Sequence, residues 1–242
     1  MEKSRLTEIN KAIALAGLQI KAVKLRPTDP FIWASGTRNP IYDDNRMFLW
    51  YPEYRNLVVE GFSIMVNQHV KNPSECVIAG TMSAGIPWAA MVAQRLNLKM
   101  IYVRDKPKDH GLKNQIEGRD ADEDLEGFNV VLIEDLISTG GSSVALVDAV
   151  RKANGNCNLC LSIFNYGLPN PIKMFAGKIP YKTDEKNVAH SLSFPCELKS
   201  ILYYPELISV GIENGFISKN QNEMLLDWMA DQPHWGEKNG FV

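Results

Sequence analysis

Short apolar runs alternate with longer amphipathic stretches through the middle of the chain. The apolar runs have the length of strands that are buried on both faces of a sheet. They cover residues 76–80, 98–103, 130–133 and 158–164. Helical patterns separate them at residues 86–96 and 142–154. This alternation predicts a doubly wound α/β fold, with a central, mostly parallel sheet flanked by helices.

The two ends of the chain carry further helical patterns. Residues 52–70 begin with proline, which suits the first turn of a helix, and their apolar positions recur at helical spacing. Helices are also predicted at residues 4–16, 205–216 and 221–229. Residues 31–50 are rich in aromatic and turn-forming residues, which predicts loops and short strands.

One segment, residues 130–142, combines an apolar run with polar groups suited to a ligand. Glu134 and Asp135 follow the run, at the end of a strand where open α/β sheets bind ligands. Gly140 and Gly141 allow backbone N–H groups to face an anion at the next helix start. Hydroxyl donors follow at Ser138, Thr139, Ser142 and Ser143. Because ionised carboxylates only accept hydrogen bonds, the acid pair suits ribose hydroxyls. The predicted ligand is a ribose that carries a phosphate.

A second turn repeats this arrangement. Residues 80–87 read Gly-Thr-Met-Ser-Ala-Gly-Ile-Pro, and they lie between a predicted strand and a predicted helix. We expect Gly80 and Gly85 to permit unusual backbone angles in this turn. Neither turn contains the Gly-Lys-Ser/Thr of a Walker loop, and residues 130–142 lack a dinucleotide-binding Gly-x-Gly-x-x-Gly.

A basic segment follows the predicted strand that ends at Val103. It carries four cationic or potentially cationic groups: Arg104, Lys106, Lys108 and His110. Residues 105–127 are charged, and their few apolar positions are Leu112, Ile116 and Leu125. A long loop of this kind in a compact domain is usually either a functional lid or disordered. Its cations supply the counter-charge that a pyrophosphate requires.

The acid pair followed by Thr-Gly-Gly resembles the phosphoribosyl-pyrophosphate (PRPP) motif of the type I phosphoribosyltransferases. The resemblance implies that the acids hold the ribose 2- and 3-hydroxyls, that the glycine-rich turn holds the 5-phosphate, and that the second turn holds pyrophosphate. It implies a single domain over residues 1–242 with the type I fold. A small hood is then expected from residues 20–50 and 180–204, and a mobile loop at residues 105–127.

Three further segments resemble the orotate branch of this family. They are Arg-x-x-x-Lys-Asp-His-Gly at residues 104–111, the stretch at residues 29–46, and the tail at residues 204–235. The resemblance implies transfer of the phosphoribosyl group of PRPP to N1 of orotate, giving orotidine 5-monophosphate and pyrophosphate. It also implies Mg²⁺ carried on PRPP with no direct protein ligand, and a homodimer that shares the loop across subunits.

The resemblance assigns roles by position. Catalytic roles fall to Lys108, His110 and Asp135, and orotate binding falls to Ser138 and Tyr42. PRPP binding falls to Arg104, Lys106, Lys108, His110, Glu134, Asp135, Leu136, Ile137, Ser138, Thr139, Gly140, Gly141 and Ser142. Asp105, Ser83-Ala84 and Ala34 depart from cations that many members carry. The cation that pairs with the orotate carboxylate therefore stays open, with Arg46 and Arg38 as candidates.

The composition of the chain argues against several classes of protein. Hydrophobic residues make up 45% of the chain, charged residues 22%, and the formal net charge is −2, which argues against a nucleic-acid partner. Apolar runs are too short to span a membrane and the first residues do not resemble a signal peptide, so a cytoplasmic protein is expected. Cys157 and Cys160 lack a second ligand pair, and the cysteines are expected as buried thiols.

Two alternatives remain open from the sequence. One is another type I phosphoribosyltransferase, which acts on a purine or on uracil, because the ribose-phosphate motif does not distinguish among bases. The other is a non-catalytic nucleotide-sensing regulator on the same fold. The cations of the basic segment favour an enzyme, and this segment together with residues 29–46 favours orotate.

Overall fold

The computed structural model describes residues 2–33, 36–105, 115–120 and 123–241. Its centre is a six-stranded sheet in which every neighbouring pair is parallel except β6 and β7. In spatial order the strands are β12 (Glu197–Tyr203), β9 (Asn156–Asn165), β8 (Asn129–Ile137), β5 (Cys76–Thr81), β6 (Lys99–Val103) and β7 (Ile116–Glu117). The four predicted strands are confirmed, and β7 and β12 are additional.

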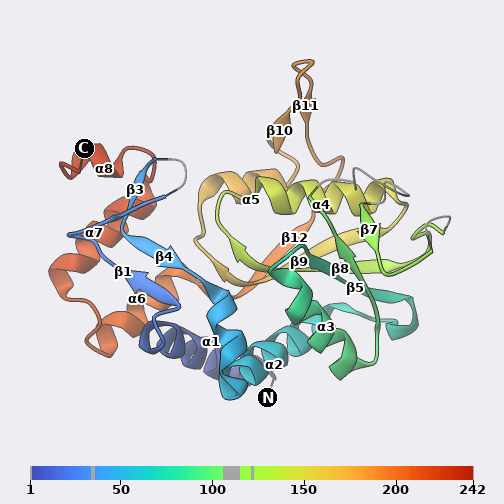
Figure 1. Ribbon diagram of the computed structural model, residues 1–242, viewed down its shortest axis with the longest axis horizontal. Helices are drawn as coiled ribbons and strands as arrows, with labels where there is room; N and C mark the ends of the chain where they lie inside the picture. Colours follow the sequence, from blue (N-terminus) through green and yellow to red (C-terminus); the bar gives the residue numbers. More distant parts are fainter. Residues whose placement is uncertain (1, 34–35, 106–114, 121–122, 242) are drawn as a thin grey trace.

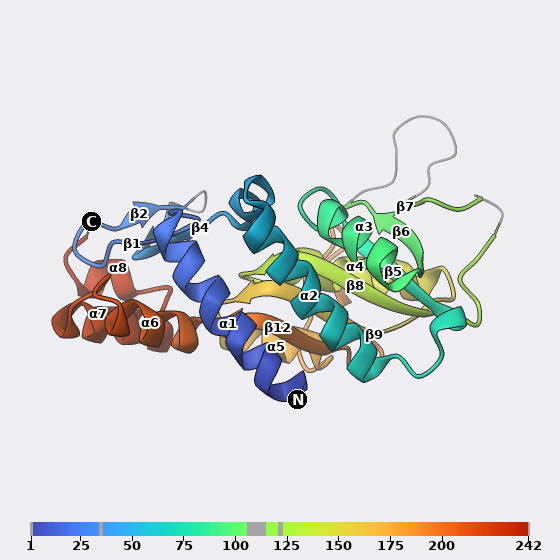
Figure 2. The ribbon, with the colours of Figure 1, turned by 90° about the horizontal axis from the view of Figure 1, so that it is seen from below.

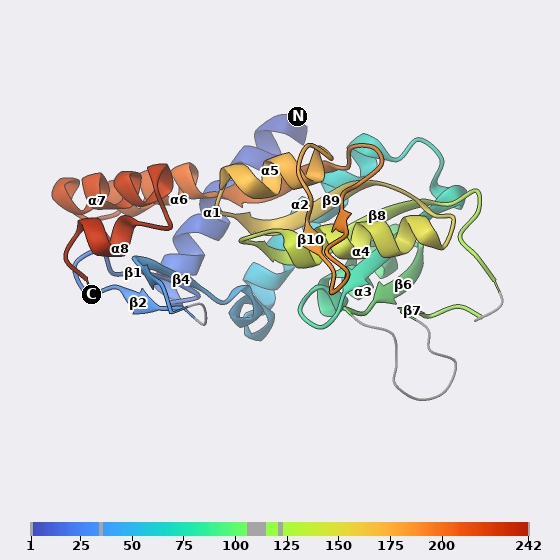
Figure 3. The ribbon, with the colours of Figure 1, turned by 90° about the horizontal axis from the view of Figure 1, so that it is seen from above.

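Helices cover both faces of the sheet (Figure 1). One face carries α1 (Glu2–Gln19), α2 (Pro52–His69) and α3 (Gly85–Leu96), which Figure 2 shows from below. The other face carries α4 (Gly141–Lys152) and α5 (Pro169–Phe175), which Figure 3 shows from above. Short 3₁₀ helices lie at η1 (Asn45–Trp50) and η2 (Pro73–Glu75).

Alternating side chains of the central strands supply the two cores. In β8, Val131 and Ile133 pack with the α1–α3 side, whereas Val130 and Leu132 pack with the α4 side. Successive residues of a strand point to opposite faces, so a strand buried on both faces must be apolar throughout. This requirement produces the apolar runs that made the strands predictable.

A smaller subdomain, the hood, lies at one end of the sheet (left in Figure 1). Its strands form two antiparallel pairs. The pairs are β1 (Val23–Leu25) with β4 (Ile41–Asp43), and β2 (Phe31–Ile32) with β3 (Arg38–Asn39). Its helices are α6 (Tyr204–Glu213), α7 (Lys219–Ala230) and α8 (Trp235–Lys238). The predicted helices at residues 205–216 and 221–229 are therefore confirmed as α6 and α7.

The expected hood boundary at residues 180–204 needs correction. β12 pairs in parallel with β9 inside the main sheet, and Ile201 and Leu202 are buried there. β10 (Lys182–Thr183) and β11 (Ala189–His190) form a hairpin that projects from the α5 side of the sheet, away from the hood (Figure 1). Glu197 and Lys199 interrupt the apolar pattern of β12, as is usual for an edge strand.

One buried amide joins the strands of the hood to its helix α7, and the same helix packs on the main core. Asn39 is fully buried on β3, and its Oδ1 accepts hydrogen bonds from Nε1 of Trp228 at 2.8 Å and from Nε2 of Gln232 at 3.1 Å. The Trp228 ring packs against Trp33 of the hood and Tyr166, which follows β9. The hood and the sheet therefore share one continuous apolar core.

We expect Asn39→Ala to lower the free energy of unfolding by about 1–3 kcal/mol, because the buried indole N–H of Trp228 loses its acceptor. Urea unfolding followed by tryptophan fluorescence measures this loss. The double variant with Trp228→Phe has no orphaned N–H group, so its loss should be smaller than the sum of the two single losses. Strict additivity of the two losses would contradict the role given to this hydrogen bond.

Candidate functional site

Glu134 and Asp135 lie within the last four residues of β8, which continues to Ile137 instead of ending at Ile133. The two neighbouring acids nevertheless lie in different surroundings. Glu134 turns toward α4 and is buried. Asp135 is partly exposed, and its backbone oxygen accepts a hydrogen bond from Nδ2 of Asn45 at 3.1 Å.

Internal partners occupy both carboxylate oxygens of Glu134. Oε1 accepts hydrogen bonds from Oγ1 of Thr81 at 2.8 Å and from the backbone N–H of Asp135 at 3.0 Å, and Oε2 accepts one from Oγ of Ser143 at 3.1 Å. Burial, together with the adjacent charge of Asp135, raises the pKa of Glu134 to about 8. Glu134 therefore braces the surrounding turns, and Asp135 is the acid of the pair that reaches the solvent.

The turn after β8 presents backbone and hydroxyl donors at the start of α4. Gly140 has a φ of +78°, and a Cβ atom there would lie 2.8 Å from Cβ of Pro171, so only glycine fits. Gly141 has an ordinary φ and is the first residue of α4. Thr139 and Ser142 are exposed and Ser138 is partly exposed, whereas the hydroxyl of Ser143 already serves Glu134. The exposed donors and the helix start together suit an anion.

Two residues of the predicted PRPP set contribute apolar side chains to the core. Ile137 is fully buried on the α4 side, and Leu136 packs against the core on the other side. Only the backbone groups of these two residues are therefore available to bind a ligand at the end of the strand. Their side chains anchor β8 in the core where it enters the turn.

The glycines of the second turn serve close approach rather than a positive φ. Gly80 and Gly85 both lack a positive φ, which corrects our expectation. A Cβ atom on Gly85 would lie 2.3 Å from the backbone oxygen of Ile133 and 2.3 Å from Oγ1 of Thr81. The absence of a side chain at Gly85 therefore lets this turn sit directly against β8 and lets Thr81 reach Glu134.

Arg104 follows β6 at the same edge of the sheet. Its backbone N–H donates to the oxygen of Gln115 at 2.9 Å, and its Nη1 lies 3.9 Å from Oε1 of Glu117 on β7. Ile116 and Leu125, two expected apolar anchors of the basic segment, are buried. The segment thus includes a short strand. The expected site residues Lys106, Lys108 and His110, and the expected anchor Leu112, lie outside the described residues.

The structure also brings η1 to the site, as a 3₁₀ helix where the sequence predicted loops and short strands. Asn45 ties η1 to the end of β8 through the hydrogen bond to Asp135 described above. Asp44 holds the guanidinium of Arg46 with two hydrogen bonds, from Nε to Oδ1 at 2.7 Å and from Nη2 to Oδ2 at 3.0 Å. Tyr42 is 41% exposed and lies beside Lys24 across the β1–β4 pair. These side chains form the hood side of the site.

Asp43 is a buried acid next to this region. Both of its carboxylate oxygens are buried, and neither has a hydrogen-bond partner among the described residues. Burial, followed by the charges of Asp135 and Asp44, raises the pKa of Asp43 well above its usual range. The sequence signal was an acid run, Asp43-Asp44, which does not reveal which member is buried.

The described residues can also be compared with the requirements of a metal site and of a reactive thiol. Within the described part of the chain, no group of three or more His, Cys, Asp or Glu residues could hold a metal ion. The four cysteines are buried and free, as expected. Burial raises the pKa of Cys76 to about 11, which keeps that thiol protonated and unreactive. In the same described ranges, no helix combines the length and apolar character that a membrane crossing needs.

Several known proteins resemble this chain. The family model for the phosphoribosyl transferase domain matches residues 54–165. The orotate phosphoribosyltransferase of Lactiplantibacillus plantarum is 42% identical over 232 residues, which cover 96% of this chain and 99% of that protein. The orotate phosphoribosyltransferase of Staphylococcus epidermidis is 42% identical over 219 residues, which cover 90% of this chain and 97% of that protein.

Solved structures share the fold. The Aeropyrum pernix orotate phosphoribosyltransferase gives a TM-score of 0.61 at 25% identity, covering 85% of this chain and 99% of that one. The Leishmania donovani UMP synthase gives a TM-score of 0.67 at 23% identity over 91% of this chain, which spans 42% of that longer protein. These matches confirm the expected type I phosphoribosyltransferase fold. Given its 42% identity to two such enzymes along at least 90% of its length, the chain belongs to the orotate phosphoribosyltransferase family.

Proposed function

We propose that this protein transfers the phosphoribosyl group of PRPP to N1 of orotate, forming orotidine 5-monophosphate and pyrophosphate. The observation that carries the proposal is the position of Asp135, an accessible acid at the end of β8, beside the exposed donors of the α4 turn. Such a pairing suits a ribose hydroxyl and a 5-phosphate at neighbouring points of one ligand. The identity to orotate phosphoribosyltransferases supports orotate as the base.

The reaction breaks the bond between C1 of the ribose and pyrophosphate, which builds positive charge on the ribose and negative charge on the leaving group. In our proposal Asp135 holds the ribose hydroxyls and faces the developing positive charge. Thr139, Ser142 and the start of α4 hold the 5-phosphate. Arg104, with Lys106, Lys108 and His110 from the basic segment, stabilises the leaving pyrophosphate. Orotate N1 attacks as an anion, so no nucleophilic side chain is needed.

Magnesium fits this arrangement as a companion of PRPP. Mg²⁺ prefers oxygen ligands and commonly rides on substrate phosphates, where it neutralises charge. Asp135 is an accessible carboxylate of the kind that such an ion or its waters would meet, whereas the oxygens of Glu134 already have partners. In our proposal the substrate brings the ion. We also propose a cytoplasmic homodimer in which the basic segment of each subunit serves the partner's site, as the family resemblance implies.

A steady-state assay with PRPP, Mg²⁺ and orotate tests the activity, since loss of orotate absorbance follows the reaction directly. Parallel assays with uracil and with purine bases separate this activity from those of other phosphoribosyltransferases. We expect turnover with orotate and much slower turnover with the other bases. Turnover with a purine instead of orotate would contradict the proposal, and so would nucleotide binding without any turnover.

Asp135→Asn should lower kcat/KM for PRPP by roughly 10- to 100-fold, because a neutral amide is a weaker acceptor for ribose hydroxyls than a carboxylate. The urea midpoint of unfolding should stay close to that of the unmodified protein. Asp148→Asn is a matched control on α4, where Asp148 bonds to Tyr181 and Lys152, and its kinetics should not change. A collapse of stability in Asp135→Asn with normal kinetics in the folded fraction would make Asp135 structural.

Stability should fall as the pH rises toward about 8, because the pKa of Glu134 is about 8 in the folded protein and near 4.5 when unfolded. The folded state therefore holds one more proton than the unfolded state between these values, and it loses that advantage as the pH passes the upper one. Urea midpoints measured from pH 5 to 9 report this trend. Glu134→Gln should flatten it, and Glu126→Gln, an exposed control, should not. An unchanged slope in Glu134→Gln would refute the assignment.

A further inference from the structure

Asp44 engages only one edge of the Arg46 guanidinium. The contacts run from Nε to Oδ1 and from Nη2 to Oδ2 of Asp44, and the backbone N–H of Arg46 also donates to Oδ1 at 3.2 Å. A guanidinium carries five N–H donors in a rigid fork. The two hydrogens on Nη1 and the second hydrogen on Nη2 thus form a second edge, and no described residue accepts from it. The side chain of Arg46 is 60% exposed.

This free edge belongs to the site. Arg46 follows Asn45, which bonds to the backbone oxygen of Asp135, so the start of η1 is fixed against the end of β8. The hydrogen bonds to Asp44 chiefly raise the pKa of Arg46, and the charge of Asp135 adds a smaller effect in the same direction. The guanidinium thus belongs to the end of β8 that carries the acid we assign to the ribose.

The chemistry of orotate places its carboxylate in the same region. The carboxylate sits on C6, next to N1, and N1 is the atom that becomes bonded to C1 of the ribose. A base beside Tyr42 and a ribose on Asp135 therefore bring the carboxylate between these two side chains. The parallel N–H groups of a guanidinium edge match the two oxygens of a carboxylate. Asp44 already holds the guanidinium of Arg46 in place, which reduces the side-chain entropy that is lost when the ligand binds.

We infer that Arg46 binds the C6 carboxylate of orotate through the guanidinium edge that Asp44 leaves open, and that this contact distinguishes orotate from uracil. The inference rests on the proposed function and extends it by assigning a residue that determines specificity for the base. Because Arg46 is already paired with Asp44, the incoming carboxylate completes a cluster of one cation between two anions. Burial raises the pKa of Asp43, which reduces the negative charge that this neighbour adds to the cluster.

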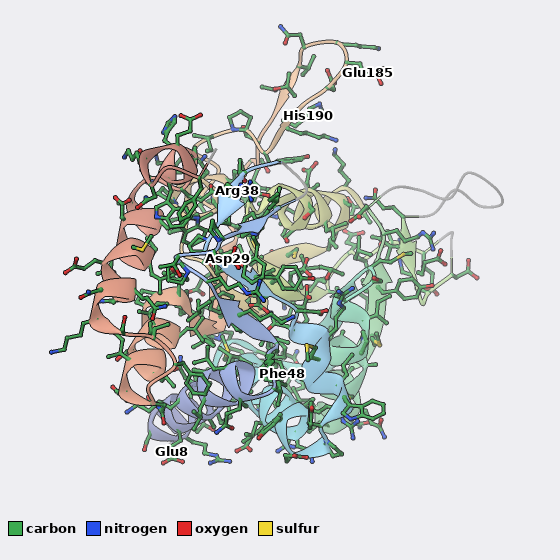
Figure 4. The ribbon with its side chains drawn as sticks, turned by 60° about the vertical axis from the view of Figure 1, so that its left-hand side comes forward. Glu8, Asp29, Arg38, Phe48, Glu185 and His190 are labelled. Atoms are coloured by element: carbon green, nitrogen blue, oxygen red, sulfur yellow. The ribbon has the colours of Figure 1, made fainter. Side chains whose placement is uncertain are left out.

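Two other cations of the hood serve as comparisons. Lys24 lies across from Tyr42, with Nζ 5.7 Å from the ring centroid, but a single ammonium lacks the two-pronged geometry of the fork. Arg38 lies on β3, toward the outer part of the hood (Figure 4), where its Cβ approaches Gly236 of α8. The structure thus favours Arg46 over Arg38, the other candidate from the sequence.

The test compares two nucleotides that differ only in the carboxylate, orotidine 5-monophosphate and uridine 5-monophosphate, by isothermal titration calorimetry on the full chain. We expect the unmodified protein to bind the carboxylated nucleotide at least about tenfold more tightly, as a charge-assisted contact would give. Arg46→Gln should reduce this ratio to about one and leave the affinity for uridine 5-monophosphate within about twofold. Lys24→Gln and Arg38→Gln should retain the ratio.

An unchanged ratio in Arg46→Gln would overturn the inference, and so would a loss of the ratio in Lys24→Gln alone. Equal binding of both nucleotides by the unmodified protein would also overturn it, while leaving the proposed activity intact. The proposed function fails on different evidence, namely no binding of either nucleotide together with no turnover of orotate and PRPP. The kinetic counterpart is a rise in KM for orotate in Arg46→Gln without a matching rise in KM for PRPP.

Discussion

The site depends on one buried carboxyl group, that of Glu134. Its hydrogen bonds reach Thr81 in the turn after β5 and Ser143 in the first turn of α4, so a single side chain connects three elements of the fold. Removal of such a group would leave two buried hydroxyls to find other partners. The side chain of Glu134 therefore fixes the separation of the two turns at the end of the sheet.

The two adjacent acids at the end of β8 differ in burial. Glu134 bonds to Ser143 of α4 and belongs to the interior, whereas Asp135 stays accessible. The hood in turn is fixed to the same end of the sheet by the packing of Trp228 on Tyr166 and by the hydrogen bond from Asn45 of η1 to Asp135. These contacts hold together two surfaces that could bind a ribose and a base.

Much of this arrangement could be predicted from the sequence, because strands buried on both faces must be apolar and the Glu-Asp-x-x-Ser-Thr-Gly-Gly turn is distinctive. β12 was missed because an edge strand tolerates charged residues such as Glu197 and Lys199. The separate roles of Glu134 and Asp135 depend on Thr81 and Ser143, which hold Glu134 from other elements of the fold, and no local pattern reveals these partners. The importance of Gly85 depends on its distance from Ile133, a contact between distant parts of the chain that no local pattern reveals.

The pairing of Arg104 with Glu117 has a consequence for the release of product. Any anion that reaches Arg104 from solvent must compete with a carboxylate that is already beside it, so binding is an exchange of partners and not a simple gain of one. When the anion leaves, the carboxylate of Glu117 can pair with the guanidinium of Arg104 again. In the proposed reaction, this competition weakens the binding of the leaving diphosphate to Arg104 and favours its release.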